Sequence, residues 1–339
     1  MKFGPVSLEH AEGKILAHNV SAVNGRPPFR KGRRLSSDDL ATLRDTGRET
    51  VYVAELDDGD LNEDASALRI AEAIYGRGLK LTGPASGRVN LRSTALGVFR
   101  VNVARLHRLN GIQGITLATL PDHATVRLNQ IVSTVKVIPF ALPESLLSQA
   151  DEVAAEGGSL VWLELLEHRS VGLILTSAPG VQSRIETQFV PLRERIEGLG
   201  SELVRVDYVD SGEEVVEAEL VEALQKQRAA GVHLIILAGE TAVMDRDDIA
   251  PRAVESAGGH VECVGAPVDP GNLLMLAYLA DIPILGAPGC ARSRKINIID
   301  WVLPRLLVGE RLGRADIVSM GHGGLLEDVP ERPMPRSRV

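Results

Sequence analysis

Aromatic residues and cysteines are scarce in this chain. Aromatic side chains make up 3% of its 339 residues, so the cores must be filled by Val, Leu, Ile and Ala, and platforms for stacking nucleic-acid bases are few. The two cysteines, Cys263 and Cys290, lack the paired spacing of a zinc site or a disulfide framework. This pattern favours a reducing compartment.

A long apolar run and an excess of basic residues are also missing. The longest apolar stretch, Leu273 to Leu285, is interrupted by Asp281 and Pro283. Glu9 and Glu12 fall where a signal peptide would be apolar. The formal net charge of −8 argues against a nucleic-acid surface, although local N–H groups can still hold a small anion. We therefore expect a cytoplasmic protein that binds neither membranes nor nucleic acid.

The length predicts about two domains, and 44% hydrophobic residues supply enough apolar material for two cores. Residues 1–166 indicate an α+β domain with short helices and a small antiparallel sheet or barrel. Its expected elements are a capped helix or turn in Ser7–His18, a helix from Ser36 to Gly47, a strand in Thr50–Ala54, a helix in Asn62–Tyr75 and several strands within Leu79–Ala141.

An acidic, helix-like stretch from Pro143 to about His168 suits a connector, and the boundary is predicted near Glu167. From there to residue 339, short apolar runs alternate with amphipathic segments. The expected strands are Val171–Thr176, Glu202–Val209, Val232–Gly239, His260–Gly265 and Asp281–Gly286, and the expected helices precede Gly200 or cover Glu214–Arg228, Asp248–Ala257 and Asn297–Leu307. This alternation predicts an α/β, doubly wound, mostly parallel sheet.

Ligands of such sheets bind outside the carboxyl ends of the strands. Three predicted strands end in loops rich in small and polar residues: Thr176–Gly180, Gly239–Ala242 and Ala287–Ser293. Small residues let backbone N–H groups approach a ligand, hydroxyls can bond phosphate oxygens, and Arg292 can bind an anion with two N–H groups. The sequence therefore predicts that three loops converge on one ligand-binding edge.

Two carboxylates follow the second of these loops. Asp245 and Asp248 could hold Mg²⁺ through a few oxygens while a substrate supplies the others. The alternative is structural: Asp247 and Asp248 can be the N-cap and the first-turn acid of the next helix. Gly239 and Gly289 can be ordinary turn residues, and Cys290 a small packing residue.

The second half resembles the molybdopterin-binding domain shared by molybdopterin adenylyltransferase and molybdopterin molybdotransferase. The matching stretches, in order, are Ala238-Gly239-Glu240-Thr241-Ala242, then Asp248, Val268-Asp269-Pro270-Gly271-Asn272, and Gly286 to Ser293. Glu240 and Ala242 stand where the family has glycines. The whole chain looks most similar to the molybdopterin-binding part of bacterial proteins in which it is fused to a nucleotidyltransferase domain.

The resemblance implies that these loops bind molybdopterin or the molybdenum cofactor. The candidate cofactor-binding residues are Ser177, Gly239, Glu240, Thr241, Ala242, Pro288, Gly289, Arg292 and Ser293, and the candidate catalytic and metal-binding residues are Asp245 and Asp248. The Gly239 and Gly289 loops would cradle the ligand, Ser177, Ser293 and Arg292 would donate to its phosphate or dithiolene end, and the carboxylates would bond the pterin or hold magnesium.

The leading hypothesis is a protein that binds this cofactor and acts in its biosynthesis or hand-over. One alternative is an enzyme that uses Mg²⁺ and ATP to adenylylate molybdopterin, or that inserts molybdate. Another is a structural or regulatory protein that keeps the fold without the ligand. The expected partners are a pterin phosphate, molybdenum-cofactor enzymes or a nucleotidyltransferase, and further copies of the chain in a homo-oligomer.

Overall fold

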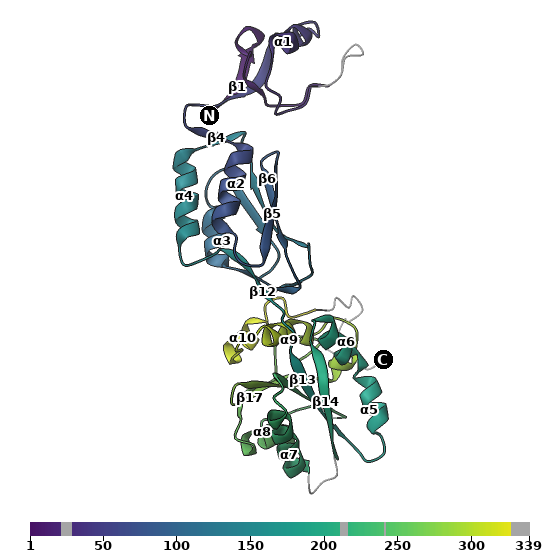
Figure 1. Ribbon diagram of the computed structural model, residues 1–339. Coiled ribbons are helices and arrows are strands. Elements are labelled where there is room, and N and C mark those ends of the chain that lie inside the picture. The colour runs from purple at the N-terminus through teal and green to yellow at the C-terminus, as the bar shows by residue number, and fades with distance from the viewer. Residues whose placement is uncertain (22–28, 211–215, 241, 327–339) are drawn as a thin grey trace. The chain divides into compact units, whose positions relative to one another are not determined.

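The computed structural model describes residues 1–21, 29–210, 216–240 and 242–326, and the chain has an α/β fold (Figure 1). Its contacts divide it into two compact units, one made of Met1–Ala95 and Phe99–Glu164 and the other of Leu96–Val98 and the chain from Leu165 onward. The assignment of 1–166 and 167–339 as separate domains stays a prediction. No helix in the described ranges is both long and apolar enough to cross a membrane.

A three-stranded antiparallel sheet opens the first unit. Its order is β1 (Lys2–Ser7), β3 (Thr50–Glu55) and β2 (Ile15–Leu16). The stretch expected as a helix or turn holds only a 3-10 turn, η1 (Leu8–His10), before β2 begins. Helix α1 (Ser37–Arg44) begins as predicted, because the Ser36 hydroxyl accepts a hydrogen bond from the Asp39 N–H.

The rest of the first unit has its own apolar core, which includes Phe99, Ile70 and Leu142. The antiparallel sheet expected there is present in the order β5-β6-β10-β8, and helix α2 packs on it beside α4 (Figure 1). The elements are β4 (Asp60–Asn62), α2 (Glu63–Ile74), β5 (Leu79–Ala85), β6 (Arg88–Ser93), β7 (Gly97–Val101), α3 (Val103–Asn110), β8 (Ile115–Thr119), β9 (Thr125–Val126), β10 (Ile131–Val137), β11 (Ala141–Pro143), α4 (Glu144–Ala155) and β12 (Val161–Leu165).

One expectation for this region was wrong, and another was only partly right. Helix α3 was missed among the strands, because it is short and its Asn102 cap looks like one more turn residue in the sequence. The predicted connector contains a full helix, α4, and a strand, β12, whose buried residues join the core. Two of its acidic residues, Glu144 and Asp151, pair with Arg69 of α2.

The second unit is built on a six-stranded sheet in the order β14-β13-β15-β18-β17-β16. Its strands are β13 (Ser170–Ser177), β14 (Glu202–Asp210), β15 (Leu234–Gly239), β16 (His260–Val264), β17 (Met275–Leu279) and β18 (Ile282–Gly286). The first four strands in this order are parallel, which confirms a mostly parallel sheet, whereas β17 runs antiparallel to both of its neighbours, β18 and β16. Strand β17 was missed, because the apolar stretch that holds it and β18 turns at Ala280 with a φ of 54° and has no glycine there.

Helices cover both faces of this sheet. One face packs against α5 (Gln182–Gln188), α6 (Val190–Gly198), α9 (Ile299–Leu307) and α10 (Arg314–Ser319), and the other against α7 (Val216–Ala229) and α8 (Ile249–Ser256). Figure 1 shows α7 and α8 side by side, as their contacts require. The amphipathic segments of the sequence thus became the two outer layers of a doubly wound domain.

Strands β13 and β15 approach each other closely at their carboxyl ends. Thr176 pairs with Gly239 in the parallel register, and a Cβ added to Gly239 would lie 1.9 Å from the Thr176 Oγ1 and 2.8 Å from its carbonyl oxygen. Real Cβ atoms do not tolerate such contacts. Gly239 is therefore a requirement of strand packing.

We expect Gly239→Ala to lower the free energy of unfolding by about 2 kcal/mol, because the added methyl group overpacks a buried strand end. Urea unfolding measures this loss. Gly198→Ala is the matched control, since a Cβ there meets nothing within 4 Å. Thr176→Ala should restore part of the loss in the double variant, and equal stabilities of the two glycine variants would contradict the packing argument.

Candidate functional site

The three loops expected to converge do end at one edge of the sheet. Strands β13, β15 and β18 are parallel neighbours, and their last residues pair at the same end. The Ala178 N–H donates to the Glu240 Oε2 at 3.0 Å, and the Arg292 guanidinium donates to the Gly239 carbonyl oxygen. The loops after the three strands are thus joined by side chains. The carboxyl ends of β13 and β15 also form the point at which the strand order reverses, where such folds bind ligands.

The predicted site residues are divided between the two faces of the sheet. Side chains alternate along a strand, and Leu175 of β13 belongs to the core on the α5, α6 and α9 face. Ser177 therefore lies on that same face, and Thr176 lies on the α7 and α8 face. Arg292 lies on the same face as Ser177. Its guanidinium is 5.1 Å from the centroid of the Phe189 ring, and Phe189 belongs to the core between the sheet and helices α5, α6 and α9.

Ser177 and Arg292 both have buried polar atoms without a hydrogen-bond partner among the described residues. Ser177 is 2% exposed, and in the described part of the chain its Oγ makes no hydrogen bond. Arg292 is only partly buried as a residue, but its Nε is buried and has no partner there either. A buried donor left unpaired costs about 1–3 kcal/mol. Both atoms lie on one face of the sheet, at the end of β13 and after the end of β18, with β15 between these two strands.

The opposite face has a small pocket at the same strand ends. It has a volume of about 260 Å³, and its lining includes Thr176, Glu240, Ala242 and Asp248 beside apolar residues of α7 and α8. None of the described side chains that line it is basic. The two faces thus offer a ligand different chemistry: unpaired donors on one face and carboxylates on the other.

Asp248 and Asp245 are occupied by backbone hydrogen bonds. The Asp248 Oδ1 accepts from the Ile249 N–H at 2.8 Å and its Oδ2 from the Met244 N–H at 3.1 Å, so Asp248 caps the N-terminus of α8. The Asp245 Oδ1 accepts from the Asp247 N–H at 2.9 Å. Capping was expected first of Asp247, and the structure gives that role to Asp248.

These carboxylates fit Mg²⁺ poorly on their own. Each already accepts hydrogen bonds from the backbone, and the described part of the chain has no group of three or more His, Cys, Asp or Glu side chains that could hold a metal ion. The catalytic and metal-binding roles of Asp245 and Asp248 stay predictions.

The remaining loop residues have mixed positions. Pro288 is buried at the start of the 3-10 helix η2 (Gly289–Arg292), whereas a Cβ added to Gly289 would meet open space. The Ser293 Oγ accepts from the Lys295 N–H at 3.1 Å, so its hydroxyl shapes a turn. Thr241 lies outside the described residues.

Helix α6 holds the η2 loop in place, a feature that the sequence did not reveal. Arg195 donates to the Ser293 carbonyl oxygen at 2.7 Å, to the Lys295 carbonyl oxygen at 2.8 Å and to the Asp300 carboxylate at 2.8 Å. The Arg294 guanidinium pairs with Glu194 and lowers the pKa of that carboxyl. Nothing in the sequence distinguishes Arg195 from a solvent-facing helix residue, because its partners are about a hundred positions away.

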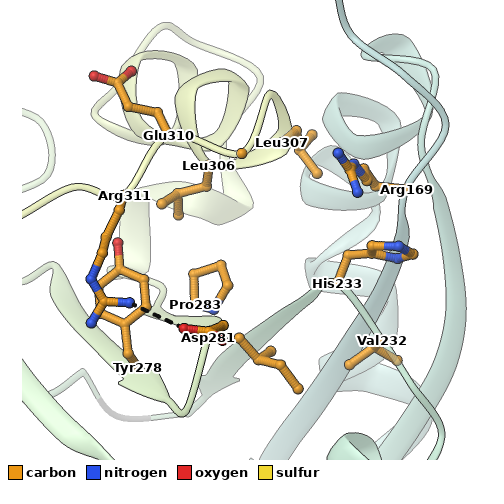
Figure 2. Close-up of a pocket in the computed structure, with 12 residues that line it drawn as sticks. Arg169, Val232, His233, Tyr278, Asp281, Pro283, Leu306, Leu307, Glu310 and Arg311 are labelled. Atoms are coloured by element: carbon orange, nitrogen blue, oxygen red, sulfur yellow. Dashed lines mark ion pairs between the residues drawn. The ribbon is translucent and has the colours of Figure 1, made fainter.

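A second pocket of the same unit lies at the opposite edge, where β13, β15 and β18 begin. It has a volume of about 400 Å³ (Figure 2). Arg169 and His233 line one side, and Arg311 stacks 4.1 Å from the Tyr278 ring centroid on the other and pairs with Asp281 at 3.9 Å. No predicted site residue is among its described lining residues. Charges of both signs face this pocket, so it does not select a ligand charge.

Comparisons with known proteins find a match to one family model and a distant similarity to solved structures. Residues 5–55 match a family described as Domain of unknown function (DUF8806), and no curated protein matches the chain. A molybdenum cofactor biosynthesis protein from Pyrococcus furiosus is similar at 13% identity and a TM-score of 0.26, over 94% of this chain and 65% of that one. The molybdopterin biosynthesis MoeA protein from Pyrococcus horikosii is similar at 12% identity and a TM-score of 0.30, over 91% and 75%.

These structures are similar to the chain in fold, and only distantly. The chain spans less than two thirds of the length of the Pyrococcus furiosus protein.

We expect Asp248→Ala to lower the free energy of unfolding by about 1 kcal/mol, because it removes the cap of α8, and Asp248→Asn to cost much less, because Asn caps equally well. Thermal and urea unfolding of the two variants test this. Asp247→Ala is the control, since the Asp247 side chain is exposed and caps nothing. Equal losses in the Asn and Ala variants would mean that the negative charge, and not the cap, is what matters.

Cys290 should react slowly with iodoacetamide in the native protein. Burial raises the pKa of its thiol to about 11, so the reactive thiolate is rare at neutral pH and increases only as the pH approaches that value. Mass spectrometry of the alkylated protein follows the reaction, with the denatured chain as the reference. Rapid modification near neutral pH would show an activated thiol and contradict a packing role.

Proposed function

We propose that the second unit binds a phosphorylated pterin, molybdopterin or the molybdenum cofactor, at the carboxyl ends of β13, β15 and β18, and that the protein acts in the biosynthesis or hand-over of this cofactor. The observation that carries the proposal is the pair of buried, unpartnered polar atoms at this edge, the Ser177 Oγ and the Arg292 Nε. A phosphate oxygen accepts hydrogen bonds from both kinds of donor.

Arg292 is oriented for such a role before a ligand arrives. One of its terminal nitrogens donates to the Gly239 carbonyl oxygen, and its plane rests on the Phe189 ring. Because these contacts fix the guanidinium, less side-chain entropy is lost when a ligand binds. The buried Nε has no hydrogen-bond partner among the described residues.

The pterin part of the proposal rests on the order of the loop motifs. The stretches 238–242 and 286–293 resemble the molybdopterin-binding family in sequence, and their described residues follow β15 and β18 at the edge where Ser177 and Arg292 are found. Loops 239–242 and 288–289 would contact the ring, and Asp245 or Asp248 would accept from its N–H groups. A protein that hands over a cofactor also needs a receiver, and we propose a molybdenum-cofactor enzyme, a nucleotidyltransferase or a further copy of this chain.

Catalysis with Mg²⁺ and ATP has less support than binding. The carboxylates that would hold the metal cap a turn and a helix, and no observation on the described residues favours a reaction over binding. A carrier needs only the donors described above.

We expect Ser177→Ala to weaken molybdopterin binding about tenfold, because it removes a donor to the phosphate, and to stabilise the free protein by up to about 1 kcal/mol, because it removes an unpaired buried hydroxyl. Isothermal titration with anaerobically prepared molybdopterin measures the first effect, and thermal unfolding the second. Ser201→Ala is a matched control, because the Ser201 Oγ is also buried and unpartnered but precedes β14 at the opposite edge.

The control should gain stability without a change in affinity. If the purified protein does not bind molybdopterin while a known member of the family does, the proposal fails. If Ser177→Ala and Ser201→Ala have the same affinity as the unmodified protein, the ligand does not bind at this edge.

A further inference from the structure

Glu240 directly follows β15, at the point where the strand order of the sheet reverses, and bonds to the neighbouring chain segment around the end of β13. Its backbone N–H donates to the Thr176 carbonyl oxygen at 3.1 Å, which extends the pairing of β13 and β15 by one residue. Its side chain then reaches the loop after β13, where the Oε2 accepts from the Ala178 N–H at 3.0 Å. The backbone of Glu240 is therefore bonded to β13, and its side chain to the loop that follows β13.

The Glu240 carboxylate lies where folds of this type bind the anionic group of a ligand. Backbone N–H groups at the carboxyl ends of parallel strands are the donors that such folds offer to phosphates. Ala178 directly follows Ser177, whose buried hydroxyl has no hydrogen-bond partner among the described residues. In this chain the N–H already has a negatively charged acceptor, from its own polypeptide.

We infer that Glu240 determines the charge selectivity of the ligand-binding edge. Its carboxylate takes the Ala178 N–H and places a fixed negative charge at the strand ends, so an incoming anionic group is excluded from the crevice between β13 and β15. The anion is directed to the Ser177 and Arg292 face, and the crevice on the α7 and α8 face receives an uncharged, donor-bearing part of the ligand. This inference rests on the proposed function and adds an orientation to it.

The lining of the pocket on the α7 and α8 face agrees with this selectivity. Glu240 and Asp248 are the ionisable residues that line it, and no basic side chain among the described lining residues offsets them. Two carboxylates repel a phosphate and attract N–H donors. Arg292, in contrast, contacts the Phe189 ring on the other face.

The experiment measures the binding of inorganic pyrophosphate to the full chain by isothermal titration. Glu240→Gln removes the charge but keeps an oxygen that can accept from Ala178, and Glu240→Ala removes both. We expect pyrophosphate to bind about tenfold more tightly to Glu240→Gln than to the unmodified protein, and more tightly again to Glu240→Ala. Because Glu240 is exposed, the gain should shrink as salt is added.

Glu197→Gln is the matched control. It removes the same charge from an exposed residue of α6, near the helix end that precedes the start of β14, and should leave pyrophosphate affinity unchanged. Adding Ser177→Ala to Glu240→Ala should reverse part of the gain, because the anion would then have lost a neighbouring donor. NMR gives a readout without ligand: the Ala178 amide should exchange faster with solvent in Glu240→Ala than in Glu240→Gln.

Pyrophosphate affinity that is equal in the unmodified protein and both Glu240 variants would overturn the inference, and Glu240 would then only tie two loops together. The inference would also be overturned if Glu240→Ala lowered the melting temperature without increasing the affinity for pyrophosphate. Neither result touches the proposed function, which depends on molybdopterin binding by the unmodified protein and on the loss caused by Ser177→Ala.

Discussion

The parallel pairing of β13 with β15 is the constraint on which the candidate site depends. Thr176 pairs with Gly239, and the two backbones come so close that no side chain fits at position 239. Because β13 and β15 end in register, the loops that follow them start side by side. The Glu240 carboxylate can therefore reach the Ala178 N–H, and the pairing of β15 with β18 brings the Arg292 guanidinium to the Gly239 carbonyl oxygen in the same way. A shift in the register of β13 and β15 would separate the loops that follow these two strands.

The carboxyl ends of these strands present different polar groups on the two faces of the sheet. Alternation along β13 sends Ser177 toward α5, α6 and α9, and Thr176 toward α7 and α8. The first face has unpaired donors, and the second has carboxylates. An edge with one chemistry on each face suits a ligand with an anionic end and an uncharged, donor-bearing end, as a phosphorylated pterin has. A ligand of uniform charge would leave one of the two faces unsatisfied or repelled.

Helix α6, which packs on the sheet, also holds the loop after β18 in place. Arg195 of α6 binds two carbonyl oxygens of the loop after β18 as well as the Asp300 carboxylate, and its side chain is only 11% exposed. Such a charged, largely buried anchor fixes the loop that contains Arg292. The loop that contains Arg292 is therefore held in place without a ligand, which would favour the binding that we propose.

The sequence by itself determined most of the periodic elements of the second unit and the edge at which the polar loops gather. Local patterns were sufficient for this: a Ser36 cap marks the start of α1, and apolar runs such as β15 mark buried parallel strands. Tertiary structure alone decided the reversed direction of β17, the face on which Ser177 lies, and the partners of Glu240 and Arg195. The physical reason is that a buried strand has the same apolar composition in either direction, and that the donors and acceptors of these side chains become neighbours only when distant segments pack together.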